Sequence, residues 1–363
     1  IKKEGSVFDL AIAAGLLVSS MYFPEAEVNS TVFLGELSLD GTVKGVKGIL
    51  PMCMEAKKQG FTRIITSNES SQEAALVSGI DVIGVNNLIE IVDFLNGSLS
   101  IEPTVSSLEQ QLLTKFDDWD FKDVKGQHTV KRALEIAAAG SHNVLMIGPP
   151  GSGKTMLARR LPSILPDMSF EESLEVTKIY SVAGLLKENE SMIFKRPFRS
   201  PHHTISAASL VGGGRIPKPG EVSLSHFGVL FLDEMPEFPK HVLEVLRQPL
   251  EDECVTISRV NGTITYPAKF MLIASVNPCP CGYFGDESNR CSCSASQIKN
   301  YIGKISGPLM DRIDLHVEVK PVKFNDLSDE IKSESSSSIK ARINKAREIQ
   351  MKRYSKDGIY FNS

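Results

Sequence analysis

The segment 148–155, which reads GPPGSGKT, is the part of the chain whose residue types and spacing point most directly to chemistry. It fits the pattern G-x-x-x-x-G-K-[ST], in which glycines let backbone N–H groups turn inward around a polyphosphate. Lys154 is expected to reach the β- and γ-phosphates, and the Thr155 hydroxyl to bind Mg²⁺. The apolar run 143–147 and the helical run 156–161 supply the strand, loop and helix order that the motif needs. The predicted nucleotide contacts are Gly148, Pro149, Pro150, Gly151, Ser152, Gly153, Lys154, Thr155 and Met156.

Two adjacent acids, Asp233 and Glu234, follow a second apolar run, 228–232. A parallel strand that is buried on both faces has this composition, and open α/β sheets place their ligands at the carboxyl ends of such strands. Asp233 is expected to hold Mg²⁺, directly or through water, and Glu234 to polarise an attacking water molecule. Together with the phosphate loop upstream, the pair predicts nucleotide hydrolysis.

The composition is that of an ordinary soluble globular protein, with 363 residues, 42% hydrophobic and 23% charged, and a net charge of −4. The length predicts two or three domains. No apolar run approaches the roughly 18 residues of a membrane span, so we expect a cytoplasmic protein with no membrane partner. Because the chain is not basic overall, any contact with nucleic acid needs local patches. The chain begins within an element, and we expect it to be part of a longer protein.

Residues 1–97 predict an α+β domain. The expected elements are helices over 8–20, 52–60, 71–78 and 88–95, strands over 31–34, 63–66 and 81–85, and a hairpin with an Asp-Gly turn at 40–41. This order, with the motifs KEG at 3–5 and GELSLDG at 35–41, resembles the proteolytic domain of Lon proteases, a fold shared with ribosomal protein S5 domain 2. The resemblance places Val7 where Lon has its serine nucleophile and Leu50 where it has its lysine base. Because neither side chain can do that work, we expect a non-proteolytic scaffold that serves substrate positioning, ring assembly or structure alone.

Segments around the phosphate loop resemble AAA+ ATPases, which bind ATP with Mg²⁺. The motif FKDVKGQ at 121–127, followed by a helix predicted over 128–139, is similar to the element that covers adenine. The run 269–276 predicts a third buried strand, and the resemblance makes Asn277 at its end a sensor of the γ-phosphate. The alternative is an asparagine that caps a turn before Pro278.

The motif GPLMDRID at 307–314, before a strand predicted over 315–319, resembles the arginine-finger segment of the chelatase and MCM branches of AAA+ proteins. In that role Arg312 acts on ATP bound by the neighbouring subunit and neutralises charge in the transition state, which requires a ring. The alternative is a local salt bridge with Asp311 or Asp314.

Five more motifs resemble one bacterial branch of these ATPases. They are RPFRSPHHT at 196–204, LVGGG at 210–214, PGEVSL at 219–224, LRQPLE at 246–251 and NPCPCGY at 277–283. Together they look like the ComM family, also called YifB, of magnesium chelatase-like ATPases, over essentially the whole chain. The resemblance implies a homo-hexameric ring and an ATP-driven DNA helicase that promotes branch migration in recombination and natural transformation. Its implied partners are single-stranded and branched DNA, including recombinase-bound DNA.

Two insertions distinguish this branch. Residues 209–227 interrupt the helix before the Asp233 strand, and residues 254–268 predict a β-hairpin with an Asn-Gly turn at 261–262. Related motors point such hairpins into the ring pore. The candidate contacts to the DNA backbone are therefore Arg215, Lys218 and Arg259. Each alone is better explained as an ordinary solvated charge, but sixfold repetition would make a modest patch matter.

Four cysteines, Cys279, Cys281, Cys291 and Cys293, lie within fifteen positions. Four thiolates suit a structural Zn²⁺, although the usual spacing is C-x₂₋₄-C and here it is C-x-C. The polar loop between the pairs is unable to fold unaided, and a metal would explain it. Free or redox-active thiols and disulfides are the alternatives.

The predicted fold class is α/β, with an AAA+ P-loop core of parallel sheet and flanking helices after the Lon-like α+β domain. The expected ranges are 1–97 for that domain, 98–120 for a linker, 121–320 for the ATPase core and 321–363 for the start of a helical lid. Within the last range, the serines at 335–338 predict a flexible connection and 339–354 a helix rich in Lys and Arg.

The sequence is compatible with three functions. The first is a DNA motor, the second is a chelatase-like ATPase that remodels a protein partner, and the third is an ATP-dependent protease. The Lon-like domain together with the four-cysteine loop argues against the second, and Val7 and Leu50 argue against the third.

Overall fold

The computed structural model describes residues 6–106, 119–187, 190–215, 217–259, 262–285, 290–321 and 333–354. The chain forms two compact units, one of Ile1–Lys115 with Ser173–Phe194, and one of Phe116–Glu172 with Lys195–Ser363. The segment Ser173–Phe194 lies inside the range expected for the ATPase core, yet it groups with the N-terminal unit. Among the described residues, no helix combines the length and the apolar character needed to cross a bilayer.

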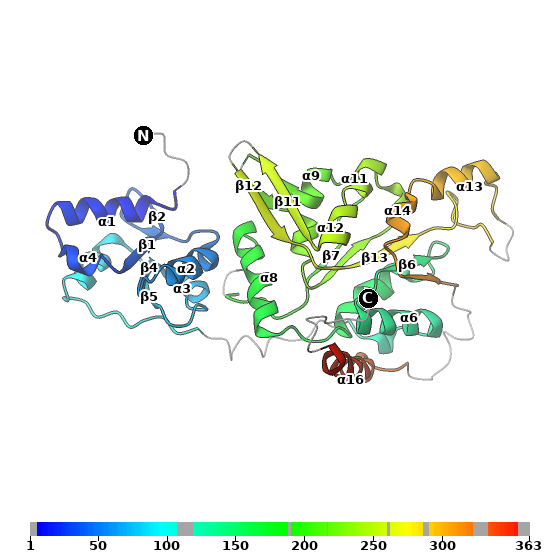
Figure 1. Cartoon of the computed structure of the whole chain (residues 1–363), viewed down its shortest axis with the longest axis horizontal. Coiled ribbons are helices and arrows are strands. Elements are labelled where there is room, and N and C mark those ends of the chain that lie inside the picture. The colour runs from blue at the N-terminus through cyan, green and yellow to red at the C-terminus, as the bar shows by residue number, and fades with distance from the viewer. Residues whose placement is uncertain are drawn as a thin grey trace. The chain divides into compact units, whose positions relative to one another are not determined.

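The N-terminal unit is built on a parallel three-stranded sheet of order β1-β4-β5 (Figure 1). Its strands are β1 Thr31–Leu34, β4 Arg63–Ser67 and β5 Asp81–Val85, with a small hairpin of β2 Glu36–Leu37 and β3 Val43–Lys44. Its helices are α1 Asp9–Ser19, η1 Glu25–Glu27, α2 Ile49–Lys58, α3 Asn68–Ala74 and α4 Leu88–Leu95. The predicted order of elements is confirmed, with shifts of up to four residues at the ends of helices.

The two positions expected to match the Lon dyad are occupied by packing residues. Leu50 is fully buried in an apolar cluster, and Val7 packs against that cluster. Neighbouring Ser6 donates its hydroxyl hydrogen bond to Glu36. Among the described contacts of Ser6 there is no lysine that could act as the base of a Ser-Lys dyad.

Helix α8, Phe170–Ala183, leads into the segment Ser173–Phe194, which belongs to the N-terminal unit. The Ser181 hydroxyl donates to the Glu73 carboxylate, and the Gly48 N–H donates to the Ser181 carbonyl at 3.1 Å. Glu73 also accepts from the Leu50 N–H at 3.1 Å, and burial raises the pKa of Glu73. The segment is therefore held by polar contacts inside an apolar core that includes Met192.

The second unit contains a parallel five-stranded sheet of order β14-β6-β13-β10-β7 (Figure 1). The strands are β6 Val144–Ile147, β7 Phe198–Arg199, β10 Val229–Leu232, β13 Met271–Val276 and β14 Leu315–Glu318. Strands β10 and β13 are buried at every position, which is the pattern expected for strands covered on both faces. This sheet and its flanking helices confirm the predicted α/β class of the core.

The elements around this sheet are short except for α6 and α16. The helices are η2 Phe121–Asp123, α6 His128–Gly140, α7 Lys154–Arg160, η3 Leu161–Ser163, α9 Ala207–Val211, α10 Glu221–Leu224, η4 Met235–Glu237, α11 Lys240–Glu244, α12 Arg247–Asp252, α13 Ala295–Ile302, α14 Gly307–Met310 and α16 Ser336–Tyr354. Two small hairpins join β8 Gly212–Gly213 to β9 Lys218–Pro219, and β11 Cys254–Arg259 to β12 Gly262–Pro267.

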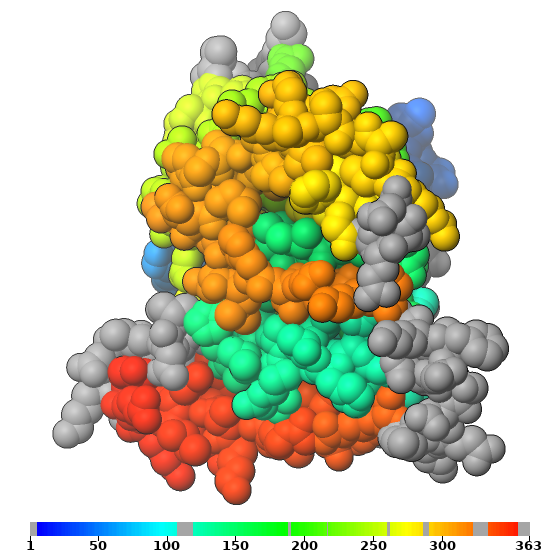
Figure 2. All heavy atoms as spheres, turned by 90° about the vertical axis from the view of Figure 1, so that its right-hand side faces the viewer, coloured from blue at the N-terminus to red at the C-terminus, as the bar shows by residue number. Residues whose placement is uncertain are grey.

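Helix α16 packs along α6, and Figure 2 shows the red helix lying against the teal one. Ile339 and Ile343 of α16 enter the apolar core of the unit. The prediction of a flexible serine connection at 335–338 was wrong in part, because α16 already begins at Ser336. The buried Ser336 hydroxyl accepts from the Phe121 N–H at 2.9 Å, which fixes the helix start. Of the expected linker 98–120, residues 107–118 lie outside the described residues.

Candidate nucleotide-hydrolysis site

The register of the central strands brings the predicted site residues to one edge of the sheet. Ile147 at the end of β6 pairs with Val276 at the end of β13, and Leu232 at the end of β10 pairs with Ala274. The phosphate loop, the acidic pair and Asn277 follow these three strands directly. Their meeting is therefore a consequence of parallel pairing, which aligns the carboxyl ends of neighbouring strands.

Lys154 lies inside the phosphate loop at the start of α7, where its side chain is largely buried. Its ammonium group donates to the carbonyl oxygens of Gly148 at 2.7 Å and Pro149 at 2.9 Å, and to Asn277 Oδ1 at 3.2 Å. Burial lowers the pKa of Lys154, and the nearby charges of Asp233 and Glu234 oppose that shift. A buried cation held by neutral oxygens is suited to receive phosphate anions.

The backbone of the loop has the geometry that its glycines allow. Gly153, the residue before α7, has a φ of +92°, a left-handed conformation that other side chains adopt only with strain. The neighbouring Ser152 hydroxyl is buried without a partner among the described residues. Gln127, the last residue of the predicted adenine-covering motif, donates to the Ser152 carbonyl at 3.1 Å and to the Lys320 carbonyl at 2.7 Å. That motif therefore does reach the phosphate loop.

A hydrogen-bonded chain of four residues lies beside the loop. The Thr155 hydroxyl donates to Asp233 Oδ2 at 2.8 Å, and the Ser275 hydroxyl donates to Asp233 Oδ1. Ser275 also accepts from the Glu234 N–H at 2.9 Å. Glu234 has a φ of +50°, a strained conformation for a residue with a side chain, and such strain is often found at functional sites.

The Thr155 and Asp233 oxygens fit a Mg²⁺ ion. This ion prefers hard oxygen ligands and is usually bound by one or two carboxylates, a hydroxyl and the oxygens of a substrate phosphate. Ser275 was missed by the sequence reasoning. The signal that was present is a lone hydroxyl residue near the carboxyl end of an otherwise apolar strand, MLIASV.

Arg312 lies at the surface and is not hydrogen bonded to the phosphate loop in the described contacts. Its guanidinium group forms a salt bridge with Glu251 of α12, and both side chains are 43% exposed. Arg312 thus forms a salt bridge, but with Glu251 and not with the expected Asp311 or Asp314. Asp314 instead accepts a hydrogen bond from the Asn143 N–H at 2.7 Å. The Asn143 side chain also donates to the Arg312 carbonyl at 2.8 Å, which holds the backbone of this segment against β6.

Comparison with known proteins identifies the family to which this site belongs. A family model described as "Magnesium chelatase, subunit ChlI" matches residues 120–327, and one described as "Subunit ChlI of Mg-chelatase" matches residues 1–70. The chain is 42% identical over 370 residues to competence protein ComM of Haemophilus influenzae, with all of this chain and 71% of that protein covered. The chain belongs to the ComM family of magnesium chelatase-like AAA+ ATPases.

Two further relatives agree with the assignment to the ComM family. The chain is 41% identical over 365 residues to YifB of Escherichia coli and 43% identical over 364 residues to an uncharacterized protein of Mycobacterium tuberculosis. Each match covers all of this chain and 71% of the relative. As an AAA+ family, ComM proteins use ATP and Mg²⁺, in agreement with the geometry of the phosphate loop and Asp233.

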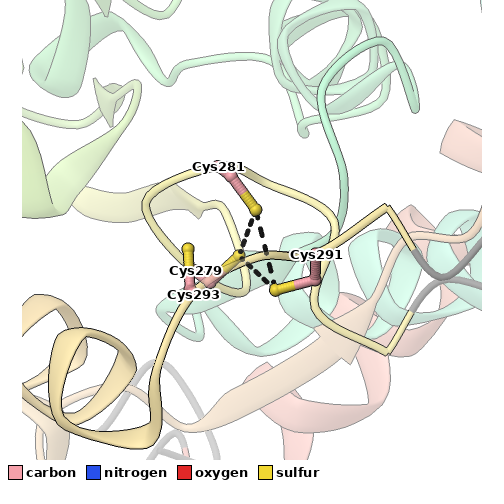
Figure 3. A group of neighbouring side chains, drawn as sticks. All are labelled: Cys279, Cys281, Cys291 and Cys293. Atoms are coloured by element: carbon pink, nitrogen blue, oxygen red, sulfur yellow. Dashed lines mark hydrogen bonds between the residues drawn. The ribbon is translucent and has the colours of Figure 1, made fainter.

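The four cysteines of this ComM family member converge (Figure 3). The Sγ atom of Cys279 lies 3.2 Å from that of Cys281 and 3.7 Å from that of Cys291, and Cys281 and Cys291 are 3.7 Å apart. With Cys293, all four sulfur atoms lie within 4.8 Å of one another. Tetrahedral Zn²⁺ with bonds of about 2.3 Å requires sulfur atoms about 3.8 Å apart. The donor set therefore fits a single zinc ion.

The two insertions of the ComM branch pack on each other. The Tyr266 hydroxyl of β12 donates to the Pro217 carbonyl at 2.9 Å, and a Cβ atom on Gly213 would lie 3.4 Å from Arg259 Nη2. Since Gly213 pairs with Lys218, the structure brings the exposed Lys218 and Arg259 together.

The third predicted DNA-binding residue and the end of the hairpin border positions outside the described ranges. Arg215 is exposed within the same insertion. Gly262, which was expected in the turn, instead pairs with Arg259 as the first residue of β12. Residues 260–261 lie outside the described residues.

Proposed function

We propose that this chain is the motor part of a homo-hexameric, ATP-driven DNA helicase that promotes branch migration of DNA junctions during recombination and natural transformation. The observation that carries the proposal is the convergence of Lys154, Thr155, Asp233 and Asn277 at the carboxyl edge of one parallel sheet. The name of the relative ComM, a competence protein, supports DNA as the substrate. DNA that is bound by a recombinase is one of the proposed substrates.

In the proposed reaction, each residue has a separate task. Lys154 and the loop N–H groups bind the β- and γ-phosphates, and Asn277, which touches Lys154, senses the γ-phosphate. Bound Mg²⁺ would supply positive charge that stabilises the phosphate oxygens during transfer. Thr155 and Asp233 would hold that ion, and Ser275 orients the Asp233 carboxylate. Glu234 polarises the attacking water.

Arg312 completes the site from the neighbouring subunit in this proposal. Its exposure and its anchoring through Asn143 and Glu251 suit a side chain that is presented outward. An arginine supplied in trans stabilises the charge that develops on the transferred phosphoryl group. This role is the reason for proposing a closed ring.

We also propose that the four cysteines bind a structural zinc ion. The support is the sulfur geometry, which matches a tetrahedral thiolate site. Zinc content of the purified protein, measured by mass spectrometry, tests this assignment directly.

The motor is tested with the full-length protein on a labelled three-stranded DNA junction, with ATP and Mg²⁺ present. The parent is expected to move the branch point, and Glu234→Gln is expected to bind ATP and to move nothing. Glu237→Gln is the matched control, because Glu237 is an exposed acid three residues away. A parent protein that neither binds DNA nor hydrolyses ATP faster in its presence would overturn the DNA-motor proposal. Stimulation by a protein partner alone would favour the chelatase-like alternative.

A further inference from the structure

The four-cysteine cluster lies directly beside the residues proposed to bind the nucleotide. Cys279 is fully buried and stands two residues after Asn277, whose side chain contacts Lys154. The chain then turns tightly, because the Gly282 N–H donates to the Cys279 carbonyl at 2.9 Å. Because a single residue separates Asn277 from Cys279, the position of the Cys279 thiol constrains the position of the Asn277 side-chain amide.

The same turn touches the phosphate loop at a second point. A Cβ atom on Gly282 would lie 2.5 Å from Cδ and 2.7 Å from Cγ of Pro150. Only glycine permits this approach, and Gly282 also has a φ of +87°. Because the ring of Pro150 is rigid, a displacement of the turn must be transmitted to the phosphate loop or open a gap beside it.

The far end of the cysteine segment is also fixed. Helix α13 begins directly after Cys293, and its start is secured by a capping box in which Ser294 and Gln297 exchange hydrogen bonds. Strand β13 and helix α13 therefore hold the two ends of the segment. Between them, the converging thiols join the turn at 279–282 to Cys291 and Cys293, and a metal bound there would hold the turn against Pro150.

We propose that zinc occupancy of the four-cysteine site sets nucleotide affinity, because the metal holds the turn that positions Asn277 and supports Pro150. This inference rests on the proposed zinc site. Removal of the metal releases the turn, so that Pro150 is no longer supported and Lys154 loses the Asn277 side chain as one of its three hydrogen-bond partners. Groups that orient a site in this way typically change its affinity or activity by about tenfold or more.

The test measures zinc per chain and the affinity for a fluorescent ADP analogue in the full-length protein. Cys291→Ser combined with Cys293→Ser is expected to abolish zinc binding and to weaken nucleotide binding about tenfold. Removal of zinc from the parent with a chelator is expected to weaken binding equally, and added Zn²⁺ to restore it when added Mg²⁺ does not. Cys254→Ser is the control, since Cys254 lies on β11 outside the cluster.

A second variant tests the contact without touching a thiol. Gly282→Ala is expected to keep its zinc and to weaken nucleotide binding, because its Cβ must displace Pro150. Thermal melting shows whether each variant is folded. A parent that holds no zinc and takes up none refutes the zinc site and this inference together. A zinc-loaded parent whose affinity equals that of folded, zinc-free variants refutes the coupling alone.

Discussion

At the scale of single residues, Ser275 shows that a site also depends on a residue outside any recognised sequence motif. Its hydroxyl donates to the Asp233 carboxylate and accepts from the Glu234 backbone, so it links the proposed Mg²⁺ ligand to the residue proposed to act on water. Ser275 is fully buried, and no other described group replaces its bond to Asp233 Oδ1. The Ser275 hydroxyl therefore holds one oxygen of Asp233, while Thr155 holds the other, and it also fixes the backbone of Glu234.

Replacing Ser275 by alanine is expected to lower kcat for ATP hydrolysis about tenfold with little change in KM. The hydrogen bond that is removed is to a charged group, and such bonds contribute about 1.5–3 kcal/mol. Steady-state kinetics of Ser275→Ala are compared with those of Ser225→Ala, which removes a buried hydroxyl that donates to the Glu221 carbonyl. The comparison separates the loss of the bond to Asp233 from the general effect of removing a buried hydroxyl. Equal kcat values for both variants would remove Ser275 from the site.

At the scale of elements, α8 shows how an ATPase segment joins the N-terminal unit through a buried acid. The Glu73 carboxylate accepts hydrogen bonds from the Ser181 hydroxyl of α8 and from the Leu50 N–H of α2. It lies beside the buried Cys53 thiol. Burial raises the pKa of Glu73, although these two hydrogen bonds oppose the shift. The acid is therefore held in a place where its charged form is disfavoured.

This arrangement predicts a pH dependence of stability. Because the pKa of Glu73 is higher in the folded chain than its ordinary value of 4.5, the folded state binds more protons, and stability is lost as pH rises from 4.5 through the raised pKa. Glu73→Gln is expected to remove this loss, so the variant gains stability relative to the parent between pH 4.5 and 7. Urea unfolding at both pH values measures the difference. A parallel dependence in both proteins would mean that Glu73 does not titrate in this range.

At the scale of the whole molecule, the proposed activity requires more than one copy of the chain. Arg312 is exposed and paired with Glu251 on its own chain, away from its own phosphate loop in the described contacts. Exposed pairs of this kind contribute about 0–1 kcal/mol, so the pairing does not prevent Arg312 from reaching a neighbour. The exposed cations of the two insertions likewise gain from sixfold repetition.

Mixing two inactive variants tests the action of Arg312 in trans. Arg312→Ala is expected to lower kcat about 10³-fold without weakening nucleotide binding, and Glu234→Gln to be inactive. In mixed rings, a Glu234→Gln subunit supplies Arg312 to a neighbour that retains Glu234. ATPase activity of the mixture should therefore exceed that of either variant alone. A mixture as inactive as its components would exclude this role in trans.

The paired insertions predict salt-dependent DNA binding. Lys218→Ala with Arg259→Ala is expected to weaken binding of single-stranded DNA and to reduce the slope of log affinity against log salt by roughly 0.7 for each DNA phosphate that is no longer neutralised. ATP hydrolysis without DNA should not change. Lys240→Ala, which removes an exposed cation outside the insertions, is the control. An unchanged slope in the double variant would place the DNA elsewhere.

The sequence alone determined the features that depend only on residues close together in the chain. Buried strands such as β10 and β13 follow from continuous apolar runs, and the phosphate loop follows from glycine spacing before a helix. The α/β class, the parallel sheet and the acidic pair at a strand end were therefore predictable. The family was identifiable as well, because its motifs are contiguous.

Contacts between residues that are far apart in the chain emerged only from the folded structure. Ser275 met Asp233, Glu251 replaced the expected acids beside Arg312, and Gly282 came to lie against Pro150. Ser336 begins a helix although serine has only a weak helix preference, because its hydroxyl accepts a buried hydrogen bond from the Phe121 N–H. Hydrophobic patterns and turn residues specify elements, but partners across the sheet are set by the register and packing of the whole fold.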